Sequence, residues 1–169
     1  YSSINSESHT IEQIDLNEIV NNIESDIELL ISEKKGIIQR EKLPVIEGAH
    51  ILVYQLFFNI LSNSFKFSKK ELNSQVTISS TIEKKDGVEF VKIKVQDNGI
   101  GIKKKQADKL FSAFSRLHPK DKFQGTGLGL ALCKKIVERH GGSIVADGKE
   151  NEGATFTVLL PLKQSQKFI

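Results

Sequence analysis

Apolar residues recur every three or four positions in three stretches of the chain, which is the spacing of one face of an α-helix. The first stretch, Leu16–Ile31, follows Asp15, a residue type that caps helix starts. The second runs from about Ala49 to Phe67, and the third covers Leu128–His140, where two glycines end it. The pattern therefore predicts three amphipathic helices.

Alternation of apolar and polar residues predicts four strands in two antiparallel hairpins. Val76–Ile82 and Val91–Val95 alternate on either side of a turn signal at Lys85–Gly87. Ile144–Ala146 and Ala154–Leu160 form the second pair, again with glycine and polar residues between them. We also expect an extended segment at residues 39–45 and a short helix around residues 106–111.

Helices placed between antiparallel hairpins are typical of an α+β fold. The sequence predicts a two-layer α/β sandwich, in which a mixed, mostly antiparallel sheet is covered on one face by helices. We expect one domain at residues 14–162, with a linker at residues 1–13 before it and a C-terminal tail at residues 163–169.

Composition narrows the class of protein. The chain has 169 residues, 38% of them hydrophobic, which suffices for one domain with its own core. Its 24 basic and 21 acidic side chains leave a net charge of +3, which argues against a nucleic-acid-binding protein. One cysteine excludes an internal disulfide, and no apolar run reaches the roughly 18–20 residues that span a bilayer. The absence of methionine, even at position 1, indicates a piece of a longer protein.

Three polar residues share one face of the second predicted helix. Asn59, Asn63 and Lys66 fall at positions i, i+4 and i+7 of an otherwise apolar segment. An amide oxygen is a ligand that Mg²⁺ accepts, and an ammonium can bind phosphate. A solvated polar face explains the same residues when they are taken alone.

Asp97 follows an apolar strand and precedes two closely spaced glycines, Gly99 and Gly101. A carboxylate at a strand end can accept a hydrogen bond from an exocyclic amine such as adenine N6, whereas guanine presents a carbonyl there. Glycines let the backbone approach a ligand closely. An ordinary Asp-Asn-Gly turn is the alternative.

A third glycine-rich segment, Gly125–Leu130, leads directly into the third predicted helix. Backbone N–H groups at a helix start favour an anion such as phosphate. The segment is not a Walker loop, because no Gly-Lys-Ser/Thr follows, and Leu132 stands where a dinucleotide fingerprint needs its third glycine.

Together, in this order, the segments resemble the ATP-binding catalytic domain of sensor histidine kinases. Five motifs over most of the chain carry the resemblance: the N box at Asn59–Ser68, the G1 box at Asp97–Ile102, the F box at Leu110–His118, the G2 box at Gly125–Cys133 and the G3 motif at Gly153–Phe156. The sequences around His118 and His140 most resemble those of phytochrome-like and hybrid kinases.

The resemblance implies a Bergerat-type fold that binds Mg²⁺ and ATP. It implies that Asn63 is the Mg²⁺ ligand, that Asn59 and Lys66 face the phosphates, and that Arg116 reaches the γ-phosphate. Asn59, Lys66 and Arg116 are then the expected catalytic residues. The remaining nucleotide contacts that it implies are Phe67, Asp97, Gly99, Gly101, Ile102, Phe114, Gly125, Thr126, Gly127, Leu128, Gly129 and Thr155.

The implied reaction is transfer of the γ-phosphoryl group to a histidine on a separate dimerisation domain of the same protein. An amide at Asn59 cannot take a proton from water, whereas gyrase-like ATPases have a glutamate there, so efficient hydrolysis is disfavoured. A degenerate nucleotide-binding module without transfer activity is the alternative. The resemblance also implies a response regulator receiver domain as downstream partner, a homodimeric full-length protein and a cytoplasmic location, without nucleic-acid or membrane contact by this domain.

The chain departs from the family pattern at two places near the N box. Ser64 stands where alanine is usual, and Ala49-His50 stands where glycine-aspartate is common, which removes a helix cap. The acceptor motif, histidine followed by an acidic residue, is absent from all four histidines, so we expect these to be structural or solvent-facing. Cys133 shares a helix face with apolar residues and is expected to be a buried, inert thiol.

Overall fold

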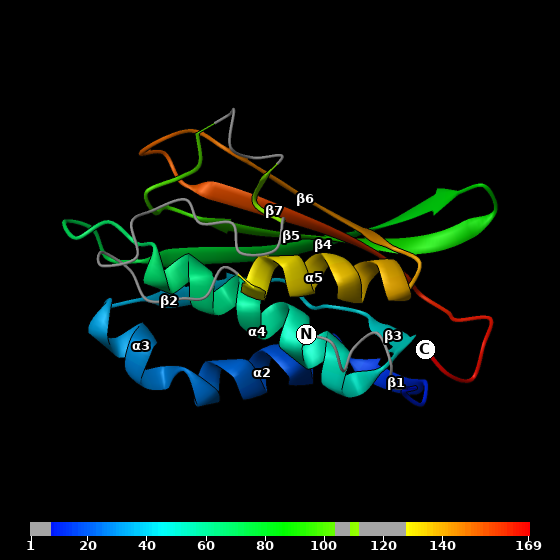
Figure 1. Ribbon diagram of the computed structural model, residues 1–169. Coiled ribbons are helices and arrows are strands. Elements are labelled where there is room, and N and C mark those ends of the chain that lie inside the picture. Colours follow the sequence, from blue (N-terminus) through cyan, green and yellow to red (C-terminus); the bar gives the residue numbers. More distant parts are fainter. Residues whose placement is uncertain (1–7, 104–108, 112–127) are drawn as a thin grey trace.

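The computed structural model describes residues 8–103, 109–111 and 128–169, and Figure 1 shows their arrangement. Its main sheet has five strands in the order β2-β4-β5-β7-β6. The strands are β2 (Ile37–Arg40), β4 (Gln75–Lys85), β5 (Val88–Asp97), β6 (Ser143–Gly148) and β7 (Ala154–Pro161). Only β2 and β4 pair in parallel, so the sheet is mixed and mostly antiparallel, as predicted.

Helices cover one face of this sheet, which confirms the α+β sandwich (Figure 1). The helices α4 (His50–Lys66) and α5 (Leu128–Arg139) contact each other along the sheet, and α2 (Leu16–Asp26) packs against α4. Helix α4 is central, because its buried side chains face both the sheet and the outer helix. Its fully enclosed apolar residues are Leu52, Val53, Leu56, Phe57, Ile60, Leu61 and Phe65.

The first predicted helix is in fact two helices. Helix α2 ends at Asp26 and α3 (Glu28–Glu33) begins two residues later, since Ile27 leaves the helical region at φ −111°, ψ 23°. Ile27 is 7% exposed, so its side chain packs into the core at the break. No residue of α3 is fully buried, and the helix packs against the core through the partly buried side chains of Leu30 and Ile31.

The predicted extended segment at residues 39–45 is also two separate strands. Strand β2 ends at Arg40, and β3 (Val45–Gly48) begins directly after Pro44, which has no N–H to donate to a ladder. Strand β3 pairs antiparallel with β1 (Glu12–Asp15), which lies partly in the expected linker. Asp15 caps α2 as predicted, since its Oδ1 accepts the Asn17 N–H at 2.9 Å.

The β4–β5 hairpin and α5 lie where the sequence predicts them. Asp86 and Gly87 have φ values of 52° and 80°, which is the left-handed backbone of a two-residue hairpin turn. Gly141 follows α5 with φ 82°, as expected of a residue that ends a helix. Most of the short helix expected around residues 106–111 falls outside the described residues.

The two ends of the described chain pair with each other. His9 and Ile169 exchange backbone hydrogen bonds of 2.7 and 2.8 Å, and the Ile11 N–H donates to Lys167 O at 2.8 Å. The side chain of Ile169 packs against the core. The segment expected as a tail therefore lies on the domain, against the expected linker. None of the helices in the described part of the chain has the length and apolar character that a membrane crossing needs.

Candidate functional site

Asp97 lies at the last position of β5, next to the first residue of β7. Its Oδ1 accepts two backbone hydrogen bonds, from the N–H of Gly99 at 2.9 Å and from the N–H of Ala154 at 3.2 Å. Burial raises the pKa of Asp97, while the hydrogen bonds from Gly99, Ala154 and the Ser64 side chain act in the opposite direction. The protein thus holds a carboxyl group in a partly desolvated position and orients it with fixed donors.

A small, mostly apolar cavity, called the inner cavity below, opens beside Asp97. Its volume is about 40 Å³, so a ring as large as a purine enters only if the walls move. The lining comes from α4, the end of β5 and the loop after it, the start of α5 and β7. It comprises Asn63, Ser64, Phe67, Asp97, Gly101, Ile102, Leu110, Leu130, Ala154 and Phe156.

The structure therefore brings together five residues that the sequence analysis assigned to nucleotide binding. Asn63, Phe67, Asp97, Gly101 and Ile102 are separated by up to 39 positions and share one cavity. Asn59 and Lys66, the other two polar residues predicted on this face of α4, do not line the inner cavity.

Asn59 contacts the first turn of α5. Its Nδ2 donates to Gly129 O at 3.2 Å, and a Cβ added to Gly129 would lie 3.7 Å from the Asn59 side chain. Lys66 is half-buried in the last turn of α4, one turn after Asn63. The polar face predicted on α4 thus extends from the contact of Asn59 with α5 to Asn63 at the inner cavity.

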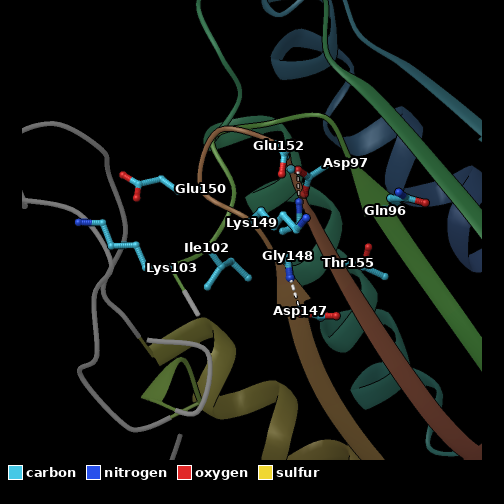
Figure 2. A pocket seen from close by; sticks show the side chains of 12 residues that line it. Gln96, Asp97, Ile102, Lys103, Asp147, Gly148, Lys149, Glu150, Glu152 and Thr155 are labelled. Atoms are coloured by element: carbon cyan, nitrogen blue, oxygen red, sulfur yellow. Dashed lines mark hydrogen bonds between the residues drawn. The ribbon is translucent and has the colours of Figure 1, made fainter. Parts of the chain in front are cut away.

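A larger open hollow of about 990 Å³, called the outer hollow, also has Asp97 in its lining (Figure 2). Asp97 and Ile102 line both spaces. Thr155, expected at the adenine edge, lines the outer hollow and pairs in register with Gln96. Five charged residues also line the outer hollow: Lys103, Asp147, Lys149, Glu150 and Glu152.

The glycines of the loop after β5 are in contact with the chain's own backbone. A Cβ on Gly99 would lie 2.5 Å from Phe67 O, and a Cβ on Gly101, which has φ +78°, would overlap Lys149 O. Backbone hydrogen bonds hold the loop on both sides, from Ile100 N to Phe67 O at 3.0 Å and from Asn151 N to Ile100 O at 2.6 Å. These glycines therefore allow the loop to fit between α4 and the β6–β7 turn. Their expected role in admitting a purine stays a prediction.

Several predicted site residues lie outside the described residues. These are Phe114, Arg116, Gly125, Thr126 and Gly127, and the side chain of Leu128 belongs with them. Their assignment to phosphate or lid contacts remains an expectation of the family resemblance.

Sequence reasoning did not assign part of the inner cavity wall. Leu110, Leu130, Ala154 and Phe156 line it, and Phe156 meets Phe111 edge to face with 6.3 Å between ring centroids. The alternation in β7 places Phe156 on the buried face, which was the available signal. Ser64 lines the cavity as well, and the sequence marks it only as a departure from the family pattern.

Cys133 is buried, as predicted. The side chain is fully enclosed, and its Sγ lies 3.6 Å from Leu56 O on α4. Burial raises the pKa of the thiol to about 12. The thiolate form that reacts with oxidants or metals is therefore suppressed.

Comparisons with known proteins agree with this arrangement. The family model described as histidine kinase-, DNA gyrase B- and HSP90-like ATPase matches residues 48–164. The chain is 32% identical over 162 residues to cyanobacterial phytochrome A of Nostoc, a match that covers 96% of this chain and 20% of that protein. It is 41% identical over 117 residues to the sensor histidine kinase WalK of Bacillus subtilis, covering 68% of this chain and 18% of that protein. The chain thus spans about a fifth of the length of these curated relatives.

Solved structures of the same kind share the fold. The catalytic domain of histidine kinase ThkA superposes with a TM-score of 0.74 at 25% identity, covering 90% of this chain and 96% of that one. Full-length ShkA, solved with AMPPNP, gives 0.75 at 22% identity, covering 94% of this chain and 33% of that one. The expected kinship with the catalytic domains of sensor histidine kinases is confirmed, and the chain belongs to the family of histidine kinase-, DNA gyrase B- and HSP90-like ATPases.

Proposed function

We propose that this domain binds Mg²⁺ and ATP and transfers the γ-phosphoryl group to a histidine on a separate helical domain of the same protein. The observation that carries the proposal is Asp97, a partly desolvated carboxyl group held by two backbone donors at the wall of an apolar cavity. A ligand that enters this cavity needs an apolar ring and a hydrogen-bond donor on its edge. Adenine, with its exocyclic amine, has both.

The surroundings of Asp97 favour a flat aromatic ligand. Phe67, Ile102 and Leu130 supply apolar walls, and Phe156 adds a second aromatic side chain. Guanine would bring a carbonyl oxygen toward Asp97, so the base would offer no proton to the carboxyl group there, which costs binding energy. The cavity therefore supports selection of adenine nucleotides.

The residues of α4 fit a metal–phosphate group next to the base. Asn63 lines the inner cavity, and its amide oxygen is a ligand type that Mg²⁺ accepts when phosphates and water complete its shell. Lys66 follows one turn later and can neutralise phosphate charge. Bound Mg²⁺ would supply charge neutralisation on the transferring phosphoryl group.

Asn59 supports transfer over hydrolysis. Its Nδ2 is engaged by Gly129 O, and an amide cannot act as a general base toward water at neutral pH. In the proposed reaction the bond between the γ-phosphorus and the bridging oxygen breaks, ADP leaves, and a phosphorus–nitrogen bond forms with the acceptor imidazole. The domain contributes positioning and charge neutralisation.

The chain spans about a fifth of the length of its curated relatives. The domains and proteins that act together with it are therefore part of the same proposal. We place the acceptor histidine on an upstream helical dimerisation domain, the next phosphoryl acceptor on a response regulator receiver domain, and the homodimeric full-length protein in the cytoplasm. The similarity to WalK, named a sensor histidine kinase, supports a histidine as the phosphoryl acceptor.

Calorimetric titration of the domain with Mg²⁺ and ATP tests the binding step. Asp97→Asn should weaken binding roughly 10- to 100-fold, because a hydrogen bond to a charged group is lost. Asp147→Asn is the matched control, since Asp147 is an exposed carboxylate on the outer hollow. Absence of binding at millimolar ATP with Mg²⁺ would refute the proposal.

The transfer step needs the full-length protein. Incubation with γ-labelled ATP should yield an acid-labile, base-stable phosphoryl label on a histidine. Nucleotide binding without any such label would instead favour the alternative, a nucleotide-binding signalling module without transfer activity.

A further inference from the structure

The residues after β7 return along the domain and pair with the residues that precede β1. Residues 162–169 are called the latch segment below, and residues 9–11 the leading segment. The end of the latch segment lies beside β1 and β3 (Figure 1). Three backbone hydrogen bonds join the two segments, from donor to acceptor His9 to Ile169 at 2.7 Å, Ile169 to His9 at 2.8 Å and Ile11 to Lys167 at 2.8 Å.

The packing of side chains adds little to this pairing. Residues 165–168 are exposed, and the aromatic ring among them, Phe168, is 55% exposed. An open groove of about 350 Å³ is lined by both segments, so their side chains leave space between them. A segment that buries little apolar surface opens locally at a low free-energy cost. The latch segment therefore depends on its hydrogen bonds.

Glu47 of β3 fastens the latch segment to the domain. Its Oε1 accepts the Gln164 N–H at 2.8 Å, and its backbone N–H donates to Leu162 O at 2.9 Å. Its Oε2 accepts from Gln13 Nε2 on β1 at 3.3 Å. Hydrogen bonds to a carboxylate are roughly twice as strong as those between neutral groups. One half-buried side chain thus holds both the latch segment and the strand that follows the leading segment.

A second side chain fastens the same stretch to the end of α5. Gln164 donates from Nε2 to His140 O at 2.8 Å, in a partly buried contact. Its backbone N–H and its side chain therefore bind two different parts of the domain. The two contacts can be removed separately, by substitutions at Glu47 and at Gln164.

We propose that residues 162–169 form a releasable latch that holds the leading segment on the domain, and that the Glu47 carboxylate keeps the latch closed. When the latch opens, residues 9–11 lose their backbone partners, while the five-stranded sheet and α4 stay folded. The closed latch would set the orientation of the domain relative to the helical domain with the acceptor histidine. This last step rests on the proposed function, and the latch itself does not.

The chain offers a matched control in Glu41. Its Oε1 also accepts a backbone N–H, that of Ser80 on β4, at 3.1 Å. Glu41 follows β2 and belongs to neither segment. Glu41→Ala therefore removes a hydrogen bond of the same type without touching the latch.

Amide hydrogen exchange of the domain, followed by NMR, tests the latch. Glu47→Ala should lower the protection of the His9, Ile11 and Ile169 amides roughly tenfold, or to the level of an unfolded chain, because a charge-assisted hydrogen bond is lost. The amides of β5 should keep their protection. Glu41→Ala should leave the three latch amides unchanged.

Two further variants separate the latch from a general loss of stability. Glu47→Gln keeps an oxygen that can accept the Gln164 N–H and should restore much of the protection. Gln164→Ala should weaken protection of the same three amides, and it serves as the test if Glu47→Ala does not fold. Unchanged protection in both alanine variants would overturn the proposal. An equal loss at the β5 amides would also overturn it, because the whole domain would then open together.

The full-length protein tests the consequence for phosphoryl transfer. With γ-labelled ATP, Glu47→Ala should change the rate of histidine labelling at least about threefold and the KM for ATP less than about twofold, because Glu47 does not line the inner cavity. Glu41→Ala should change neither quantity. An unchanged labelling rate in Glu47→Ala would refute the role in orientation. If the unsubstituted protein labels no histidine, the proposed function fails, and amide exchange still decides the latch.

Discussion

The imidazole of His140 accepts a hydrogen bond from the backbone N–H of Ala49, with 3.0 Å between Nε2 and the amide nitrogen. Its Nδ1 lies 2.8 Å from Ile136 O, and because a carbonyl only accepts, Nδ1 carries the proton. Ala49 precedes α4 and offers no side-chain cap of its own. The buried histidine after α5 therefore satisfies a donor at the start of the helix that carries Asn59 and Asn63.

This contact predicts that acid destabilises the domain through His140. Burial lowers the pKa of His140, and the positive charges of Arg139 and His9 lower it further, against the opposing hydrogen bond to Ile136. At a pH between the folded and the unfolded pKa, His140 therefore binds a proton in the unfolded chain and not in the folded one. The contribution of His140 to stability is complete above its unfolded pKa of about 6.5 and declines as pH falls from there toward the lowered folded pKa.

Urea denaturation between pH 8 and pH 5 measures this effect. The free energy of unfolding should decline with a slope of at most about 1.4 kcal/mol per pH unit from this residue, and His140→Gln should remove that part of the slope. His50→Gln replaces an exposed histidine at the first position of α4 and should leave the slope unchanged. Identical pH dependence in the His140 variant and the unsubstituted domain would contradict the assignment.

Gly101 should be among the least replaceable residues of the site. Its φ of +78° disfavours any side chain, and a Cβ would overlap Lys149 O. Gly87 has nearly the same φ of +80° with open space around it. Gly87→Ala should cost about 1 kcal/mol from backbone strain alone, and Gly101→Ala about 3 kcal/mol or more, measured by thermal or urea unfolding. Equal costs at the two positions would show that the backbone contact is unimportant.

Asn63 should couple nucleotide binding to the metal. Asn63→Ala removes the amide oxygen from the inner cavity wall, so the increase in ATP affinity on adding Mg²⁺ should shrink roughly tenfold or more. Binding of ATP in EDTA should change much less, since the base contacts at Asp97 stay in place. A variant that keeps the full magnesium effect would remove Asn63 from the metal site.

Cys133 should resist thiol reagents in the folded domain. The side chain is fully enclosed, and its pKa of about 12 leaves almost no thiolate at neutral pH. A chromogenic disulfide reagent should react only as fast as the domain unfolds, so the rate should rise steeply with urea. Rapid modification in buffer, with the far-ultraviolet spectrum unchanged, would contradict the burial.

The parts of the site that sequence reasoning found are those set by local geometry. Asn59, Asn63 and Lys66 share a face because a helix repeats every 3.6 residues, and Asp97 follows a strand whose alternation is clear. The meeting of Asn63 and Asp97 in one cavity was implied only by family resemblance, since no local pattern states how α4 lies on the sheet.

The parts that sequence reasoning missed depend on contacts distant in the chain. Strand β1 exists because Glu12–Asp15 pairs with β3, and its single fully buried residue, Ile14, gives no alternating signal. The break at Ile27 keeps the apolar spacing of a continuous helix, so the pattern could not reveal it. The close approach of Gly101 to the Lys149 backbone joins two loops that are distant in the chain, and no local pattern gives it.

The hydrogen bonds between His9 and Ile169 bring the two ends of the described chain to one place on the domain. Any segment joined before residue 9 or after residue 169 would begin at the same place on the surface, next to the β1–β3 sheet and the His140 contact with α4. The two connections would therefore have to move together.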